Sequence, residues 1–173
     1  LHTKAFPAHA KMAARVAALR LAAAASRPSD AVNPEHYRRM IRFFEMDSQD
    51  RNVTGIVRSA RLTNVEQNRL SAEFVVTPCK IHHFGTLPGG CSATMVDCLT
   101  CAALIVATGR PAVSVNLNMS YMNPALLGTV VRIDAEVIKA GHSLAYTKAE
   151  LIRVEDGAQI ASAKHTLAFN KRV

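Results

Sequence analysis

The sequence lacks the features by which nucleic-acid-binding and membrane-spanning proteins are usually identified. Among 173 residues there are three tyrosines, six phenylalanines and no tryptophan, and no recognition motif or basic-aromatic pattern accompanies the net charge of +8. Residues 1–34 hold five basic residues and one acidic residue, so 16 − 12 = +4 remains for the rest. The one apolar stretch longer than about 18 residues, at 84–109, is interrupted by Asp97. We therefore expect neither nucleic acid nor membrane among the partners.

Cysteine is also scarce, and no signal-peptide pattern suggests disulfides. The four cysteines are Cys79, Cys91, Cys98 and Cys101. Three of them lie in the apolar stretch, where cysteine usually packs as a small hydrophobic residue. A zinc site would need a second ligand pair, and Cys79 with His82 and His83 offers only a loose version of one. We expect free thiols in a reducing compartment, no metal and no cofactor.

Acidic residues are absent before Asp30, which sets the amino-terminal segment apart from the rest. Residues 12–27, M-A-A-R-V-A-A-L-R-L-A-A-A-A-S-R, are amphipathic, arginine-bearing and acid-free, as is typical of a mitochondrial presequence. We interpret residues 1–33 as an Ala/Arg-rich leader, either a presequence or partly tag-derived. The expected location is mitochondrial or cytoplasmic. An alanine-rich helix docked on the folded body is an equally good interpretation.

Residues 34–173 carry the pattern of one α+β domain. Asn33-Pro34-Glu35 starts a helix, because a capping side chain precedes proline at the first helical position. Strand-like segments follow at residues 54–62, 69–77, 112–121, 129–139, 143–154 and 159–169, and T-N-V-E-Q-N joins the first two as a hairpin. The apolar stretch lies between the second and third segments as one long helix. Because a helix that is apolar nearly all round must be covered on all sides, we predict a curved antiparallel sheet wrapped around it.

Two features of the central helix carry chemistry. Asp97 is expected to be buried, and a buried carboxylate is costly unless it is hydrogen-bonded or employed. Gly89 and Gly90 open the helix, where free backbone N–H groups can hold an anion or a developing oxyanion. Simpler interpretations exist for both: Thr94 and Thr100 satisfy Asp97, and the glycines only form a turn.

The strand after the central helix has an alternating pattern. Ser114, Asn116 and Asn118 are expected on one face, and Val113 and its apolar neighbours on the other. This pattern alone is typical of an ordinary half-solvated strand.

Three motifs occur in order: G-T-L-P-G-G-x-S-A-T-M-V-D, S-V-N-L-N-M-S-Y-M-N-P-A-x-x-G and V-x-K-A-G-x-S-L-A-Y-T-x-A-E-L. In these motifs the chain resembles the hotdog-fold acyl-CoA thioesterases of the thioesterase superfamily, which include a small mammalian member and bacterial phenylacetate-pathway members. The resemblance covers roughly residues 38–170. It implies the hotdog fold, hydrolysis of medium- to long-chain or aryl acyl-CoA to free acid and CoA, and a homodimer or a dimer of dimers.

The same resemblance implies roles for individual residues. The Gly89 amide would hold the thioester carbonyl of a substrate, and Asp97 of a second subunit would activate water or attack directly. Ser114 would help to place the water. His82 stands where the family has an asparagine that helps to hold the carbonyl, and Pro88 stands where it has a histidine. The residues implied near the substrate are Gly90, Asn116, Tyr121, Met122, Asn123, Pro124, Lys139, Gly141, His142 and Ser143.

Two other functions fit parts of the sequence. Hotdog dehydratases acting on 3-hydroxyacyl thioesters carry a histidine before a phenylalanine and an acid on the helix, a pattern that His83, Phe84 and Asp97 imitate. A non-catalytic acyl-CoA-binding protein is the other alternative, because His82 and Pro88 depart from the family pattern.

Overall fold

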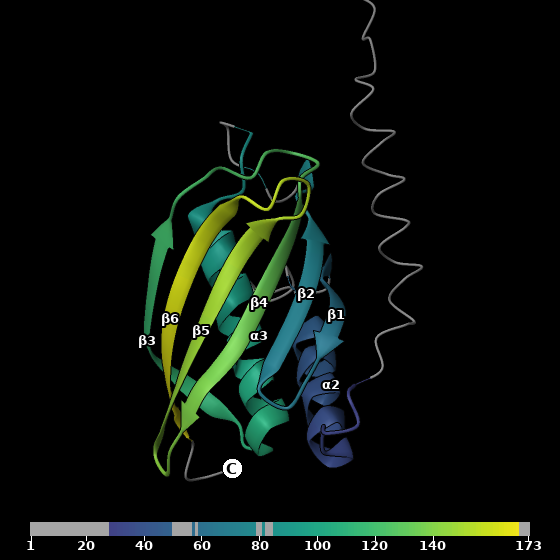
Figure 1. Ribbon diagram of the computed structural model, residues 1–173, viewed down its shortest axis with the longest axis vertical. Coiled ribbons are helices and arrows are strands. Elements are labelled where there is room, and N and C mark those ends of the chain that lie inside the picture. Colours follow the sequence, from purple (N-terminus) through teal and green to yellow (C-terminus); the bar gives the residue numbers. More distant parts are fainter. Residues whose placement is uncertain (1–27, 50–56, 58, 79–80, 82–84, 170–173) are drawn as a thin grey trace, which may run out of the picture.

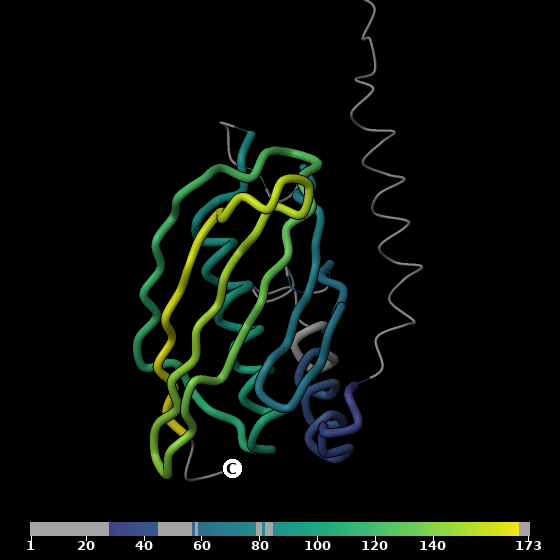
Figure 2. The backbone as a smooth tube through the Cα atoms, in the orientation of Figure 1, coloured from purple at the N-terminus to yellow at the C-terminus, as the bar shows by residue number. Residues whose placement is uncertain are grey.

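The computed structural model describes residues 28–49, 57, 59–78, 81 and 85–169. In these residues a single curved antiparallel sheet wraps around one long helix, with a second helix beside it (Figure 1). The predicted α+β arrangement is therefore confirmed. Figure 2 shows the backbone of the central helix running behind the sheet.

The described residues form one six-stranded sheet, in the order β1-β2-β4-β5-β6-β3. The strands are β1 (Arg61–Val65), β2 (Arg69–Val75), β3 (Ala112–Tyr121), β4 (Val130–Ala140), β5 (Leu144–Arg153) and β6 (Gln159–Phe169). Each neighbouring pair is antiparallel. The two edges are therefore β1, which lies beside the second helix, and β3, which lies at the far side (Figure 1).

The central helix, α3 (Gly89–Thr108), provides much of the core. Its fully buried side chains include Met95, Leu99 and Leu104, which pack with Phe74 of β2 and Ile133 of β4. By length and composition α3 could cross a membrane. In this fold, however, the sheet and the second helix cover most of it, as is usual for the core helix of a globular domain.

The second helix, α2 (Pro34–Gln49), begins as the sequence predicts. Asn33 Oδ1 accepts hydrogen bonds from the backbone N–H groups of Glu35 (2.8 Å) and His36 (3.3 Å). This is an N-cap, and it satisfies two of the amide groups that a helix start leaves unpaired.

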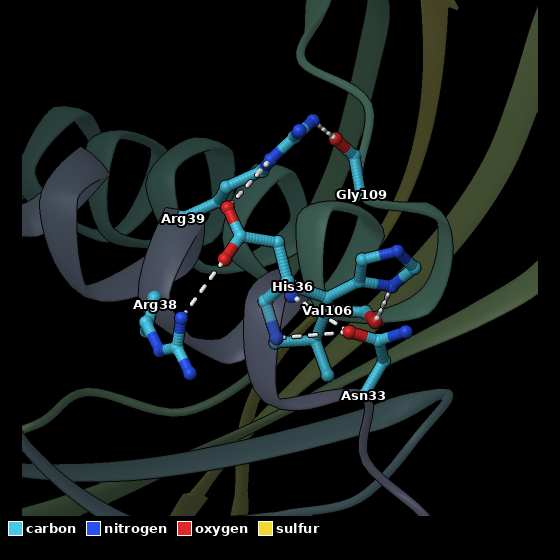
Figure 3. A network of polar contacts seen from close by, with 7 residues as sticks. Asn33, His36, Arg38, Arg39, Val106 and Gly109 are labelled. Carbon is cyan, nitrogen blue, oxygen red and sulfur yellow. Dashed lines mark hydrogen bonds and ion pairs between the residues drawn. The ribbon is translucent and has the colours of Figure 1, made fainter.

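Helix α2 is joined to the end of α3 by two side chains (Figure 3). His36 Nδ1 donates to the carbonyl of Val106 (3.1 Å), and Arg39 donates to the carbonyl of Gly109 (2.7 Å). Gly109 ends α3 in the left-handed region, with φ of 69°, and its N–H donates to the carbonyl of Ile105 (2.7 Å). A Cβ at this position would lie 2.5 Å from His36 Nε2. The close packing of α2 therefore requires glycine here.

The first hairpin differs from the prediction. Strand β1 covers Arg61–Val65, whereas the sequence pattern placed the strand at residues 54–62 and the turn immediately after it. The turn is shorter, with Glu66 and Arg69 exchanging backbone hydrogen bonds around two residues. The prediction was wrong because Gln67 and Asn68 alone make the turn, while Thr63 to Val65 are strand-forming residues. Residues 50–56 lie outside the described residues.

The last residues of the predicted leader pack against the folded domain. The N–H of Ser29 donates to the carbonyl of Val65 at 3.0 Å, and the side chain of Val32 is buried in the common core. Residues 29–33 therefore pack with the domain.

Candidate active site

Asp97 lies on α3 beside the β3 edge of the sheet, next to Ser114 of β3 and His165 of β6. Its side chain is 42% exposed in the single chain, so the prediction of a buried carboxylate was wrong. The neighbouring positions Ala93, Thr94 and Cys101 on this side of the helix are also only partly buried. The reason is that the sheet ends at β3 and leaves a stripe of α3 open beside this edge. Asp97 is thus accessible to a ligand or a partner.

Ser114 contacts Asp97 directly. The Ser114 hydroxyl donates to Asp97 Oδ1 at 2.6 Å, the short distance expected of a hydrogen bond to a carboxylate. The Thr100 hydroxyl instead contacts the backbone carbonyls of Val96 and Asp97. The hydroxyl group that binds the Asp97 carboxylate is therefore that of Ser114, the serine for which the family resemblance implies a role in placing the water.

A β-bulge in β3 changes which residues share a face with Ser114. The register against β6 shifts between Ser114 and Asn116, which leaves Val115 as the extra residue. Ser114 pairs with buried Leu167, whereas Asn116 pairs with Thr166, which points to the other face of β6. The predicted shared face of Ser114 and Asn116 is therefore wrong. Asn116 lies on the outer face of the sheet, away from Asp97.

His165 of β6 completes the cluster, and the sequence reasoning missed it. Its side chain is 1% exposed, Nδ1 lies 2.7 Å from Thr100 Oγ1, and Nε2 lies 3.5 Å from Asp97 Oδ1. Burial lowers the pKa of His165 below its ordinary value, and the Asp97 carboxylate opposes this only in part. Thr100 Oγ1 and His165 Nδ1 share a hydrogen bond whose direction follows the tautomer of the imidazole, and Nε2 makes no hydrogen bond among the described residues. A neutral His165 thus stands behind the carboxylate.

The amino-terminal end of α3 is a second functional element. Pro88 precedes it in an extended conformation, and no side chain caps the helix. The backbone amides here lie at the positive end of the helix dipole. Tyr121 donates a hydrogen bond to the carbonyl of Gly89 (2.9 Å), and a Cβ on Gly89 would lie 3.1 Å from the tyrosine ring. Gly90 is exposed, with open space around it.

These two elements are separated within one chain. Gly89 and Asp97 are eight residues apart on α3, which corresponds to roughly 12 Å along the helix axis. One thioester group cannot contact both. This agrees with the expectation that Asp97 serves the Gly89 site of another copy.

The residues predicted near the substrate fall into two groups at opposite ends of β3. Residues 121–124 follow the end of β3, on the Gly89 side: Tyr121 and Met122 are exposed, the Asn123 amide donates to the carbonyl of Gln159, and the carbonyl of Pro124 accepts from Arg153. Residues 139–143 lie at the turn between β4 and β5, near the start of β3. This second group consists of Lys139, Gly141, His142 and Ser143, which are exposed.

The other residues singled out in the sequence are not among those that the structure describes. His82, His83, Phe84 and Cys79 lie outside the described residues. Within the part of the chain that the structure describes, no group of three His, Cys, Asp or Glu side chains could hold a metal ion.

Comparison with known proteins identifies the family. Residues 84–160 match the family model described as "Thioesterase superfamily". Human acyl-coenzyme A thioesterase 13 is 37% identical over 117 residues, which are 67% of this chain and 84% of that protein. The crystal structure of zebrafish thioesterase superfamily member 2 superposes with a TM-score of 0.71 at 28% identity, over 75% of this chain and 94% of the other.

A further solved structure is similar in fold alone. It is a hypothetical thioesterase protein from Streptococcus pneumoniae, solved with coenzyme A, with a TM-score of 0.68 at 16% identity over 75% of this chain and 96% of the other. The curved sheet around α3, the motif from Gly85 to Asp97 and the two close relatives agree with one another. The chain belongs to the thioesterase superfamily and has its hotdog fold.

Proposed function

We propose that this protein is an acyl-CoA thioesterase that hydrolyses medium- to long-chain or aryl acyl-CoA to a free acid and CoA. Membership of the thioesterase superfamily supports a thioester hydrolase, and the human relative is by name an acyl-coenzyme A thioesterase. The observation that carries the proposal is the 2.6 Å hydrogen bond from Ser114 to Asp97 on the open side of α3. It places an accessible carboxylate, oriented by a hydroxyl, where a ligand can reach it.

Asp97 is the catalytic residue in this proposal. The Ser114 hydroxyl donates to the carboxylate and orients it, while the serine oxygen can accept a hydrogen bond from a water molecule. Asp97 then removes a proton from that water as the oxygen adds to the thioester carbon, and the C–S bond breaks to release CoA as a thiolate, which takes up the proton that Asp97 returns. The alternative is direct attack by Asp97 to give an anhydride that water hydrolyses.

His165 is a positioning residue in either route. It is held by Thr100 and lies behind the carboxylate at 3.5 Å. A neutral imidazole in this place adds no charge to the site. Its buried ring also limits the movement of the Asp97 carboxylate on the side away from the substrate.

The Gly89 amide would stabilise the oxyanion that forms on the thioester carbonyl. The uncapped start of α3 supplies the donor and the positive end of a helix dipole. Since the Asp97 of the same helix is too far away, the site requires a second copy of the chain.

Strand β3 is the edge through which we propose that two copies pair. Val113 and Val115 are 56% and 58% exposed, and no strand covers this edge among the described residues. Antiparallel pairing of β3 with itself over its full length sets Ala112 beside Tyr121 of the second copy. The Asp97 end of each copy then meets the Gly89 end of the other. This pairing also brings residues 139–143 of one copy close to residues 121–124 of the other.

The activity is tested by thiol release from a panel of acyl-CoA thioesters of increasing chain length, with phenylacetyl-CoA as the aryl member. Asp97→Asn should abolish turnover while acyl-CoA binding persists. Undiminished turnover in this variant would refute the role of Asp97, and water loss from 3-hydroxyacyl-CoA without thiol release would replace the proposal by a dehydratase. After a single turnover in ¹⁸O-water, label in the Asp97 peptide would establish direct attack with hydrolysis at the aspartyl carbonyl, because general-base hydrolysis puts the label only in the product acid.

The shared site is tested by mixing two impaired variants, Asp97→Asn and Gly89→Ala, after dissociation and reassembly, and comparing the mixture with each variant alone. A mixed dimer has one site with both residues intact, so an equal mixture should regain about a quarter of wild-type activity. A site built from one chain would regain none.

A further inference from the structure

Arg110 occupies a fixed position between the end of α3 and the start of β3. Its guanidinium carbon lies 3.7 Å from the centre of the Phe169 ring, and one terminal nitrogen donates to the carbonyl of His142 at 3.2 Å. The backbone N–H of Arg110 donates to the hydroxyl of Thr108. The residue is nevertheless exposed. The side chain is thus held in place with its remaining N–H groups facing solvent.

The charge of Arg110 is not neutralised within the described residues. Four other arginines of the sheet strands have a carboxylate partner, in the pairs Arg61–Glu73, Arg69–Glu136, Arg132–Asp134 and Arg153–Asp156. No described acidic side chain pairs with Arg110. Lys139, in the strand that leads into the neighbouring turn, is likewise exposed without an ion pair among the described residues. This end of the domain therefore carries positive charge that an anionic ligand can neutralise.

Arg110 also lies at a suitable distance from the proposed catalytic centre. It precedes Ser114 by four residues, which is about 13 Å along an extended strand. It stands at the same end of the sheet as residues 139–143. In the proposed pairing of β3 with a second copy, residues 121–124 of that copy lie alongside. Arg110 thus flanks the path by which an extended ligand leaves the centre.

We propose that Arg110 binds a phosphate of the CoA nucleotide and makes the enzyme selective for CoA thioesters over thioesters that lack the nucleotide. Guanidinium binds phosphate through paired N–H donors, and stacking on an aromatic ring reduces the entropy that binding would cost. The phosphate contact lies far from the reacting carbonyl, so it contributes to substrate binding and leaves the chemical step unchanged. This inference rests on the proposed thioesterase activity.

The experiment compares two substrates with the same acyl group, acyl-CoA and acyl-pantetheine. Arg110→Gln should raise KM for acyl-CoA about tenfold or more, as expected for a lost hydrogen bond to a charged group, with kcat unchanged. KM for acyl-pantetheine should stay at its wild-type value. Arg110→Lys, which keeps the charge but loses the ring stacking, should give an intermediate KM. Arg132→Gln, on the outer face of the sheet, is the matched control and should change neither KM.

A merely structural role gives a different result. If KM rises equally for both substrates, or for neither, the proposal is overturned. If wild-type protein hydrolyses neither thioester, the proposed function fails, and binding of adenosine 3′,5′-bisphosphate by calorimetry still tests Arg110. That binding should weaken at least tenfold in Arg110→Gln and fall with salt in the wild type; equal binding by both proteins refutes the inference.

Discussion

The junction between α2 and α3 allows one stability prediction to be worked out in detail. Gly109 has φ of 69°, a conformation that costs an L-residue about 1–2 kcal/mol. In Gly109→Ala the new Cβ would also lie 2.5 Å from His36 Nε2. The imidazole must move, and it loses its hydrogen bond to the carbonyl of Val106, worth about 1 kcal/mol. We expect Gly109→Ala to lower the free energy of unfolding by about 2–3 kcal/mol.

Gly157→Ala is the matched control. Gly157 has φ of 74°, but nothing lies within 4 Å of a Cβ placed there, so only the backbone strain of about 1–2 kcal/mol should appear. The measurement is urea unfolding of all variants at one protein concentration, because association alters apparent stability. In a His36→Ala background, Gly109→Ala should cost no more than Gly157→Ala. Equal costs for Gly109→Ala with and without the His36 ring would refute the reasoning.

Two further predictions concern the site. Because burial lowers the pKa of His165 despite the opposing Asp97 carboxylate, the unfolded chain binds a proton that the native state excludes as pH falls below about 6.5. The free energy of unfolding should be fully retained above that pH and decrease below it, and His165→Gln should weaken this dependence; the same pH profile in both proteins would contradict the assignment. Gly89→Ala should lower kcat about tenfold or more, since its Cβ would lie 3.1 Å from the Tyr121 ring and shift the amide donor. Gly157→Ala, where a new Cβ meets no atom within 4 Å, should keep wild-type turnover, and a Gly89→Ala enzyme as active as this control would exclude the amide from the reaction.

Sequence patterns predicted the architecture because each element has a strong local signal. Asn33-Pro34 starts α2 at the predicted residue, and the apolar stretch ends as a helix at Thr108, just before Gly109. The curved sheet could be predicted because the central helix is apolar nearly all round and must be covered on all sides. The open side of that helix was not predictable, because it depends on where the sheet ends and not on the residues of α3.

The site was predictable in part. Asp97, Gly89 and Ser114 could be named from their motifs, but strict alternation placed Asn116 on the wrong face. One extra residue in β3 reverses the order of faces, and no local pattern in A-V-S-V-N-L-N-M-S-Y reveals it. His165 was missed because a single histidine in an alternating strand is an ordinary feature. Its one signal is that the inward positions around it, Ala163 and Leu167, are apolar.

The composition of β3 has a consequence for the isolated chain. From Ala112 to Tyr121 the strand contains no charged residue and no proline, although edge strands of soluble proteins are usually protected by such residues against indiscriminate pairing. An unassembled copy therefore presents a bare backbone edge with exposed valines, which other chains can extend. If β3 pairs with a second copy as proposed, that pairing covers the edge, and a protecting lysine in the strand would weaken the same pairing.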